Sequence, residues 1–142
     1  LTSGNLTVIT SSLPVVQTLG GWQGVHLIVL GGIYLHEYQV AVGPQTLEQI
    51  RGLHAAQVVL GADGLTLEHG LTTSNILEAE VDRAIVRAAS EVIAVADSSK
   101  IGRIGLSQIA TPAEIDVLVT DRAAPEDFLD EIRRLGVTVI LA

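Results

Sequence analysis

Short runs of aliphatic and β-branched residues recur along the chain without polar alternation, and they are the strongest constraint on its fold. The runs occupy residues 6–10, 25–30, 57–60, 92–96, 116–120 and 137–141. Several of these runs are continuously apolar, which is typical of strands buried on both faces, as in a parallel sheet that helices cover. The sequence therefore predicts a mostly parallel, twisted sheet.

Patterns with helical spacing separate these runs, at residues 14–19, 46–53, 76–89 and 125–135. In the third pattern, Asn75 is placed to cap the helix and Glu78 suits a capping box. Pro125 suits a first helical turn, and Gly136 suits a C-terminal stop. Alternating strands and helices predict βαβ units with right-handed crossovers. We expect an α/β fold of three layers, Rossmann-like, with helices on both faces of the sheet.

Composition limits what the chain can be. Its 142 residues suffice for one domain with its own core, so we expect a single domain over residues 1–142. The formal net charge of −8 argues against DNA binding by this domain, which would need clustered Lys and Arg. The absence of cysteine excludes disulfides and thiolate metal sites. No apolar stretch approaches the ~18 residues that span a bilayer, and the first residues lack the basic region of a signal peptide. We expect a cytoplasmic protein without a membrane partner.

Polar and glycine-rich segments follow the predicted strands, at the edge where open α/β sheets bind ligands. The segments are Thr10-Ser11-Ser12, Gly31-Gly32, Gly61-Ala62-Asp63-Gly64, Asp97-Ser98-Ser99-Lys100 and Thr120-Asp121. Glycine lets a ligand approach the backbone, hydroxyl groups and helix N-terminal amides suit phosphate, and lysine adds a positive charge. Together these segments predict a pocket for a small, hydroxylated anion.

Each of these residues also has a purely structural interpretation, which the sequence leaves open. Ser12 and Glu78 would serve only as helix caps, and Gly31-Gly32 only as a turn. Aspartates at strand ends (Asp97 and Asp121) are common turn residues, and Lys100 would be a solvated loop lysine. No metal-ligand spacing appears among the histidines, so we expect neither a metal nor a cofactor at His26, His36, His54 or His69.

The order and spacing of the motifs resemble the C-terminal sensor domain of DeoR-family transcriptional regulators along nearly the whole chain. The motifs are those above together with Val42-Gly43-Pro44, residues 70–73, residues 75–79 and the closing residues 136–142. The resemblance implies a fold like that of ribose-5-phosphate isomerase and the binding of a phosphorylated sugar or related metabolite. It also implies a homo-oligomer, and DNA binding through an N-terminal winged helix-turn-helix outside this chain.

Carried onto matching positions, the resemblance assigns ligand-binding roles to a set of residues in both halves of the chain. Asp63 would accept hydrogen bonds from sugar hydroxyls, Glu78 would face the ligand from its helix start, and Lys100 would pair with a phosphate or carbonyl oxygen. The remaining positions would lie beside the sugar or phosphate, allow the backbone to approach it, or form the pocket rim: Ser11, Ser12, Gly31, Gly32, Gly64, Thr72 and Thr73.

The chain departs from the family pattern at three points. Ser11 stands where the family usually has Asn, and Asp82 stands where it usually has Lys. The family's opening strand, with its phosphate-contacting SGTT loop, has no counterpart. These departures imply a weakened pocket in which Lys100 is the principal cation.

Two other functions compete with effector sensing. A sugar-phosphate isomerase would use Asp63 or Glu78 as a base and Lys100 to stabilise an enediolate. The isomerases resembled here carry a second acid where this chain has Thr66, and residues 68–73 replace their Lys- and Gly-rich motif. An oligomerisation domain with an unused pocket is the third possibility. We expect effector sensing and oligomerisation without catalysis.

Overall fold

The computed structural model describes residues 5–142, so the first four residues of the predicted 1–142 domain lie outside the described part. The chain forms two compact units, one ending at Arg51 (unit 1) and one covering Gly52–Ala142 (unit 2). The units share the α/β character that the sequence predicts, and each is described by itself.

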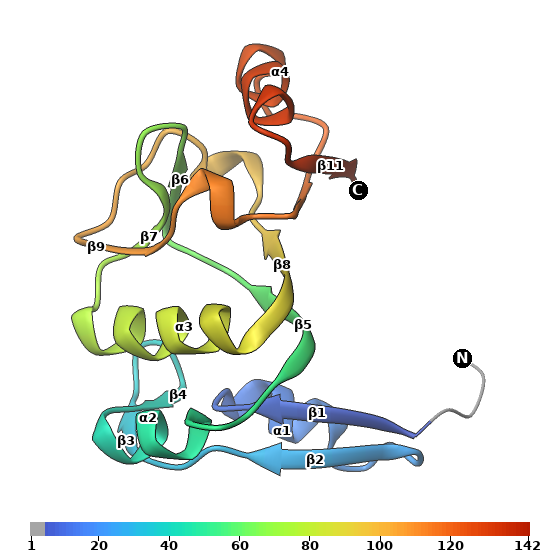
Figure 1. Cartoon of the computed structure of the whole chain (residues 1–142), viewed down its shortest axis with the longest axis vertical. Helices are drawn as coiled ribbons and strands as arrows, with labels where there is room; N and C mark the ends of the chain where they lie inside the picture. Colours follow the sequence, from blue (N-terminus) through green and yellow to red (C-terminus); the bar gives the residue numbers. More distant parts are fainter. Residues whose placement is uncertain (1–4) are drawn as a thin grey trace. The chain divides into compact units, whose positions relative to one another are not determined.

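Unit 1 pairs a small parallel sheet with a hairpin and two short helices (Figure 1). Its elements are β1 (Leu6–Thr10), α1 (Leu13–Leu19), β2 (Val25–Val29), β3 (Ile33–Leu35), β4 (Val40–Val42) and α2 (Pro44–Ile50). Strands β1 and β2 are parallel, with Val8 opposite Leu27. Strands β3 and β4 are antiparallel, with Tyr34 opposite Ala41.

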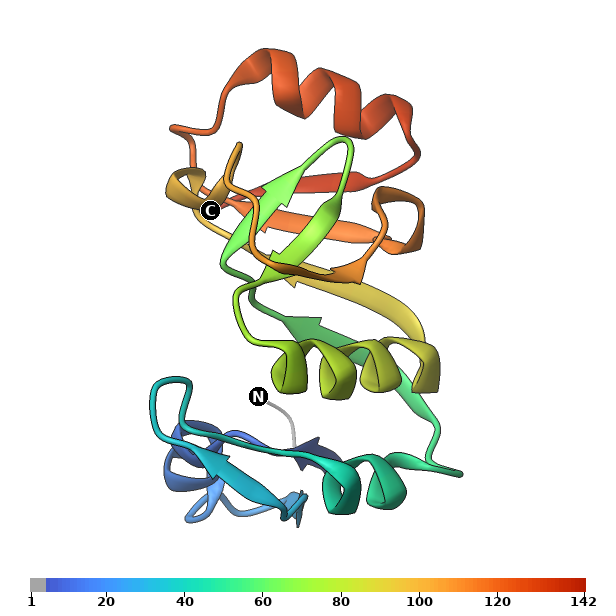
Figure 2. The same ribbon diagram turned by 90° about the vertical axis from the view of Figure 1, so that its left-hand side faces the viewer.

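Unit 2 contains a four-stranded parallel sheet in the order β11-β10-β8-β5 and a three-stranded antiparallel sheet in the order β6-β7-β9. Its elements are β5 (Ala55–Leu60), β6 (Gly64–Thr66), β7 (Gly70–Thr73), α3 (Ile76–Ala88), β8 (Ala89–Val95), η1 (Ser98–Lys100), β9 (Ser107–Ala110), η2 (Pro112–Glu114), β10 (Val117–Thr120), α4 (Glu126–Arg134) and β11 (Thr138–Leu141). Helices α3 and α4 flank the parallel sheet (Figure 2), which confirms the predicted Rossmann-like class.

The core of unit 2 lies on one face of its parallel sheet. Val58, Val92 and Leu118 are buried on neighbouring strands, and the buried helix residues Val86 and Ile132 belong to the same apolar cluster. Leu118 has no exposed surface, because it belongs to the apolar cluster that packs on this face of the sheet. Burial of this cluster supplies the main driving force for folding.

The predicted helices and apolar runs are all present, with shifts of one to three residues at some ends. Helix α2 begins at Pro44 and not at the predicted residue 46, because proline suits the first helical position. The prediction missed the strands β3, β4, β6, β7 and β9. All five are short, and β6, β7 and β9 also contain polar or glycine residues. Pairing partners distant in sequence stabilise strand β9.

Candidate functional site

Asp63 lies at the centre of a hydrogen-bond network in unit 2. Its Oδ2 accepts from the Thr73 hydroxyl at 3.2 Å and from the Ser74 backbone N–H at 2.9 Å. Its own N–H donates to the Thr72 carbonyl at 3.0 Å. The carboxylate is therefore fixed between the loop after β5 and the segment that leads into α3.

The Thr73 hydroxyl lies between two carboxyl groups. Besides its contact with Asp63, its Oγ1 makes a short hydrogen bond with Glu78 Oε2. Thr73 is 1% exposed, so solvent does not separate these groups. A hydroxyl has one proton and cannot donate to both carboxylates at once. The Thr73 proton is therefore shared between the two carboxyl groups, and the hydroxyl donates to one of them at a time.

Burial raises the pKa of Glu78, the Thr73 hydrogen bond opposes this rise, and the Asp63 charge adds to it. One helical turn further along α3, burial and the Glu78 charge raise the pKa of Asp82 to about 7. The position where the resemblance expects a lysine thus carries an acid that holds a proton near neutral pH. Sequence reasoning identified the exchange at Asp82 but not its shifted titration, which depends on burial.

The start of α3 combines the predicted cap with an unpredicted contact. The Asn75 side chain accepts hydrogen bonds from the N–H groups of Leu77 and Glu78, at 3.0 and 3.1 Å. The predicted capping box is not completed, because the Glu78 carboxyl contacts Thr73 and not the backbone N–H of Asn75. Glu78 is therefore directed toward the Asp63 network.

An open pocket of about 460 Å³ adjoins this network. Two of the sequence-predicted residues, Asp63 and Lys100, line it. Ser74, Arg103, Ile104 and Gly105 complete the lining, and sequence reasoning did not select any of them. The structure therefore brings the predicted acceptor and the predicted cation to one pocket and adds a second cation, Arg103.

Lys100 is the last residue of the short helix η1, which hydrogen bonds to two aspartate side chains stabilise. The Asp97 side chain accepts from the Ser99 N–H at 2.8 Å, and the Asp121 side chain accepts from the Ser98 N–H at 2.7 Å. Hydrogen bonds from Ser99 lower the pKa of Asp97, with a smaller contribution from the Lys100 charge. Both aspartates thus have the turn role that the structural interpretation assigned to them, and they position the lysine.

Thr72 and Gly64 hold the loop that carries Arg103. The Thr72 hydroxyl accepts from the Gly105 N–H at 2.7 Å, and Thr72 is 3% exposed. A Cβ on Gly64 would lie 2.1 Å from the Arg103 carbonyl oxygen, so only glycine permits this approach. These residues, assigned to ligand binding by the resemblance, have structural partners of their own.

Two of the predicted residues of unit 1 line a different pocket. Gly31 and Gly32 line an open hollow of about 490 Å³ with Gln45, Glu48 and Gln49. The Gly31 N–H donates to Gln49 Oε1 at 3.0 Å, and its carbonyl accepts from the hydroxyl of Thr46 at 2.7 Å. Helix α2 therefore already occupies the close approach that these glycines permit.

Ser11 and Ser12 connect β1 to α1 and contact β4. The Ser11 carbonyl accepts from the Ala41 N–H at 2.9 Å, and Ser12 forms an isolated antiparallel bridge with Val40. Ser12 occupies the N-cap position of α1, but its side chain makes no capping hydrogen bond. The expected side-chain cap at Ser12 is therefore absent.

The described part of the chain has neither a metal-binding cluster nor a membrane-spanning helix. Among residues 5–142, no group of three or more His, Asp or Glu side chains is arranged to hold a metal ion. None of the described helices is long and apolar enough to cross a membrane.

The chain is similar to a family of sensor domains and to proteins named as transcriptional regulators. A family model described as the DeoR C terminal sensor domain matches residues 1–122. The HTH-type transcriptional repressor GlcR of Bacillus subtilis is 33% identical over 99% of this chain and 54% of its own length. The HTH-type transcriptional regulator GolR of Listeria innocua is 31% identical over 96% of this chain and 54% of its length. The HTH-type transcriptional regulator GlpR of Haloferax volcanii is 36% identical over 78% of this chain and 43% of its own length. The chain thus spans about half the length of these relatives.

Proposed function

This chain belongs to the DeoR C-terminal sensor domain family, and we propose that it is the effector-binding domain of a transcriptional regulator of carbohydrate metabolism. Its effector is a phosphorylated sugar or a closely related metabolite. The observation that carries this proposal is the pocket where Asp63 and Lys100 meet, because it presents a hydrogen-bond acceptor and a cation to the same small molecule.

The chemistry of the pocket matches the two halves of such an effector. The Asp63 carboxylate accepts hydrogen bonds from sugar hydroxyls, and the Lys100 ammonium pairs with the phosphate. Hydrogen bonds from Thr73 and Ser74 hold the carboxylate in place before the ligand arrives. Such preorganisation lowers the entropy that binding must offset.

The regulator itself includes parts outside this chain. The relatives named as HTH-type proteins are about twice as long as the segment matched here, which supports a DNA-binding domain beyond it. The net charge of −8 supports a regulator in which the other domain binds DNA and this domain does not. We place the regulator in the cytoplasm, as a homo-oligomer whose subunit arrangement sets the spacing of its DNA-binding domains.

Effector binding is transmitted from the pocket through the loops that carry Lys100 and Asp63. Closure of these loops on the ligand biases the arrangement of the subunits, and the bias is limited by the difference in effector affinity between the two arrangements. The direct contact of Asp63 with the Ser74 N–H connects the pocket to the start of α3.

Binding without turnover is favoured over an isomerase by the role of Thr66. The resembled isomerases carry a second acid at this position, whereas the Thr66 hydroxyl here accepts from the His69 N–H at 3.0 Å and closes the β6–β7 hairpin. Asp63 and Glu78 remain as carboxyl groups, but Thr73 bridges them. This arrangement supports a binding site that lacks part of the acid–base set of an isomerase.

The proposal is tested by calorimetry on the full-length protein with a panel of sugar phosphates. At least one should bind, and Lys100→Ala should abolish the phosphate-dependent heat. Arg87→Ala is the matched control, because Arg87 is an exposed cation in the last turn of α3 and does not line the pocket. If no sugar phosphate binds, or if Lys100→Ala binds as well as the wild type, the proposed site is wrong.

A separate assay distinguishes sensor from enzyme. The protein is incubated with ribose 5-phosphate, and the ketose product is measured over time. We expect no steady formation of ketose, and sustained turnover that Asp63→Asn removes would contradict a purely sensory function.

A further inference from the structure

Ile104 is an aliphatic residue in a pocket whose other side chains are polar or charged. It lines the pocket of unit 2 together with Asp63, Ser74, Lys100 and Arg103. It is 62% exposed, so most of its apolar surface faces water. Single apolar side chains on a protein surface are common and do not indicate a function by themselves. Ile104 differs from them in its place in the pocket and in the rigidity of the backbone that carries it.

Hydrogen bonds hold the backbone on both sides of Ile104. Before it, the Gly102 N–H donates to the Leu65 carbonyl at 2.9 Å. After it, the Gly105 N–H donates to the Thr72 hydroxyl at 2.7 Å. A loop that is fixed at these two points cannot rotate to carry Ile104 into the apolar cluster of unit 2.

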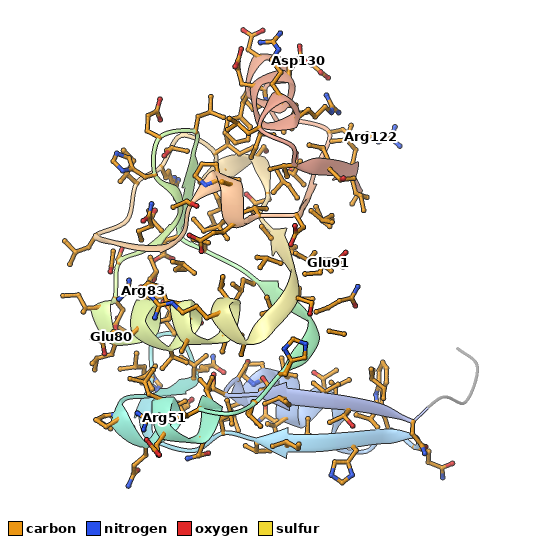
Figure 3. The ribbon with its side chains drawn as sticks, viewed as in Figure 1. Arg51, Glu80, Arg83, Glu91, Arg122 and Asp130 are labelled. Carbon is orange, nitrogen blue, oxygen red and sulfur yellow. The ribbon has the colours of Figure 1, made fainter. Side chains whose placement is uncertain are left out.

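Close packing restricts this loop further. A Cβ on Gly105 would lie 2.6 Å from the Thr73 carbonyl carbon, and a Cβ on Gly64 would lie 3.1 Å from the backbone nitrogen of Ile104. Strand β9, which follows the loop, is attached to α3, because Arg83, labelled in Figure 3, donates to a backbone carbonyl of β9. The Ile104 side chain is therefore held at the pocket before any ligand binds.

We propose that Ile104 forms an apolar subsite, and that the effector is a sugar phosphate with a methyl group, as in a deoxy or an N-acetyl sugar. The proposal rests on the sensing function above and specifies its effector further. Ligand pockets combine a few polar groups, which fix orientation, with apolar surface that matches the apolar part of the ligand. The polar side chains of this pocket suit the hydroxyl and phosphate groups, whereas Ile104 suits a methyl group.

The expected preference is set by the apolar surface that one methyl group buries. Removal of such a group from water strengthens binding about fourfold. An enclosed apolar pocket discriminates by about tenfold or more for each methylene group, but Ile104 covers the ligand from one side of an open pocket. A hydroxyl group at the same place would lose water without gaining a hydrogen bond from the aliphatic side chain, so it should bind less tightly than a methyl group.

Calorimetry on the full-length protein tests the subsite with two matched pairs of ligands. N-acetylglucosamine 6-phosphate is compared with N-formylglucosamine 6-phosphate, which lacks only the methyl group, and 6-deoxyglucose 1-phosphate is compared with glucose 1-phosphate. In at least one pair the wild type should bind the methyl-bearing compound about fourfold more tightly, and that pair identifies the substituent. Ile104→Ser should reduce the ratio to about one, whereas Ile104→Val keeps a branched aliphatic side chain and should retain most of it.

Leu106→Ser is the matched control, because Leu106 is 75% exposed in the same loop but does not line the pocket. It should leave the ratio of the two affinities unchanged. The thermal unfolding temperature of each variant shows whether it is folded, and Ile104→Ser should retain that of the wild type because its side chain is exposed. Analytical ultracentrifugation of the same variants shows whether either residue contributes to association of the subunits.

Several results would overturn the proposal, and they separate it from the function on which it rests. If a sugar phosphate binds but neither pair shows a preference, or if Ile104→Ser leaves the ratio unchanged, the apolar subsite is wrong while effector sensing stands. If Ile104→Ser changes the association of subunits and not the ratio, Ile104 is a subunit contact. If none of the four compounds binds while another sugar phosphate does, the methyl-bearing effector class is wrong. If no sugar phosphate binds at all, the sensing proposal fails as well.

Discussion

The two compact units differ in how fully they bury their apolar side chains. Unit 2 has a continuous apolar cluster that spans its parallel sheet and both flanking helices. In unit 1 the buried apolar side chains are those of Leu30, Val42 and Ile50, and α1 has no buried residue. Two-stranded sheets are marginally stable by themselves. Unit 2 can therefore fix its pocket through its own core, whereas unit 1 has little core of its own.

The largest test of this difference removes a side chain from the better core. Leu118→Ala should lower the free energy of unfolding by about 2–5 kcal/mol, because Leu118 is fully buried and its loss leaves a cavity. Leu6→Ala is the matched control in unit 1, where Leu6 is 58% exposed, and it should cost less than about 1 kcal/mol. Urea unfolding followed by circular dichroism measures both, and equal losses would contradict the comparison.

Protonation distinguishes the units further, because the described carboxyl groups with raised pKa, Glu78 and Asp82, both lie in unit 2. The folded pKa of Asp82 is about 7, above its ordinary 3.8, so the folded state binds this proton more tightly than the unfolded state. Its stabilisation is therefore fully present below about pH 4 and is lost as the pH rises through about 7. Allowing for partial solvent exposure, we expect a loss of about 2 kcal/mol.

Asp82→Asn should remove most of this pH dependence, as measured by urea unfolding at pH 5 and pH 8. Asp130→Asn is the control, because Asp130 is exposed on α4 and pairs with Arg133. A pH dependence that Asp82→Asn leaves unchanged would show that another group is responsible.

Glycine substitutions test the same difference between the two units at the backbone. Gly64→Ala should cost about 1–3 kcal/mol, since its Cβ would meet the Arg103 carbonyl oxygen, a backbone atom that cannot easily move. Gly21→Ala in unit 1 meets nothing within 4 Å and should change stability by less than about 0.5 kcal/mol. Differential scanning calorimetry compares them, and a neutral Gly64→Ala would mean that the loop carrying Arg103 is free to shift.

The smallest expected difference concerns the helix caps. Asn75→Ala should destabilise the protein by about 1 kcal/mol, because it removes two hydrogen bonds to the start of α3. Ser12→Ala should cost only a few tenths of a kcal/mol, since the Ser12 side chain makes no cap hydrogen bond to α1. If chemical denaturation gives equal losses in the free energy of unfolding for the two variants, Asn75 and Ser12 do not differ as helix caps.

Apolar runs and helix-start signals predicted the parallel sheet, the four helices and the cap at Asn75, because these signals are local in sequence. The β6-β7-β9 sheet could not be predicted in this way. Thr72 pairs with Gln108, and the sequence between them contains a helix and a strand of the other sheet. Pairings of this kind depend on tertiary packing and leave no local pattern.

The candidate site shows the same division. Asp63 and Lys100 were predicted from their positions after strands, and both line one pocket. Arg103 was missed because it follows no strand directly, and only contacts with the hairpin bring it there. The only indication in the sequence is that Arg103 follows Lys100 by three residues. This indication is weak, because an isolated arginine in a loop has no distinctive pattern.

The hydrogen bond from the Ser74 N–H to Asp63 connects the N-terminal end of α3 to the pocket, so a movement of Asp63 would tilt the helix about that end. Its 13 residues give an axis of about 20 Å. A tilt of about 5° at the attached end would therefore displace the last turn by about 2 Å. Such a displacement is comparable to the helix shifts that accompany changes between allosteric states. A small movement of Asp63 on ligand binding would therefore become a larger movement at the far end of the helix.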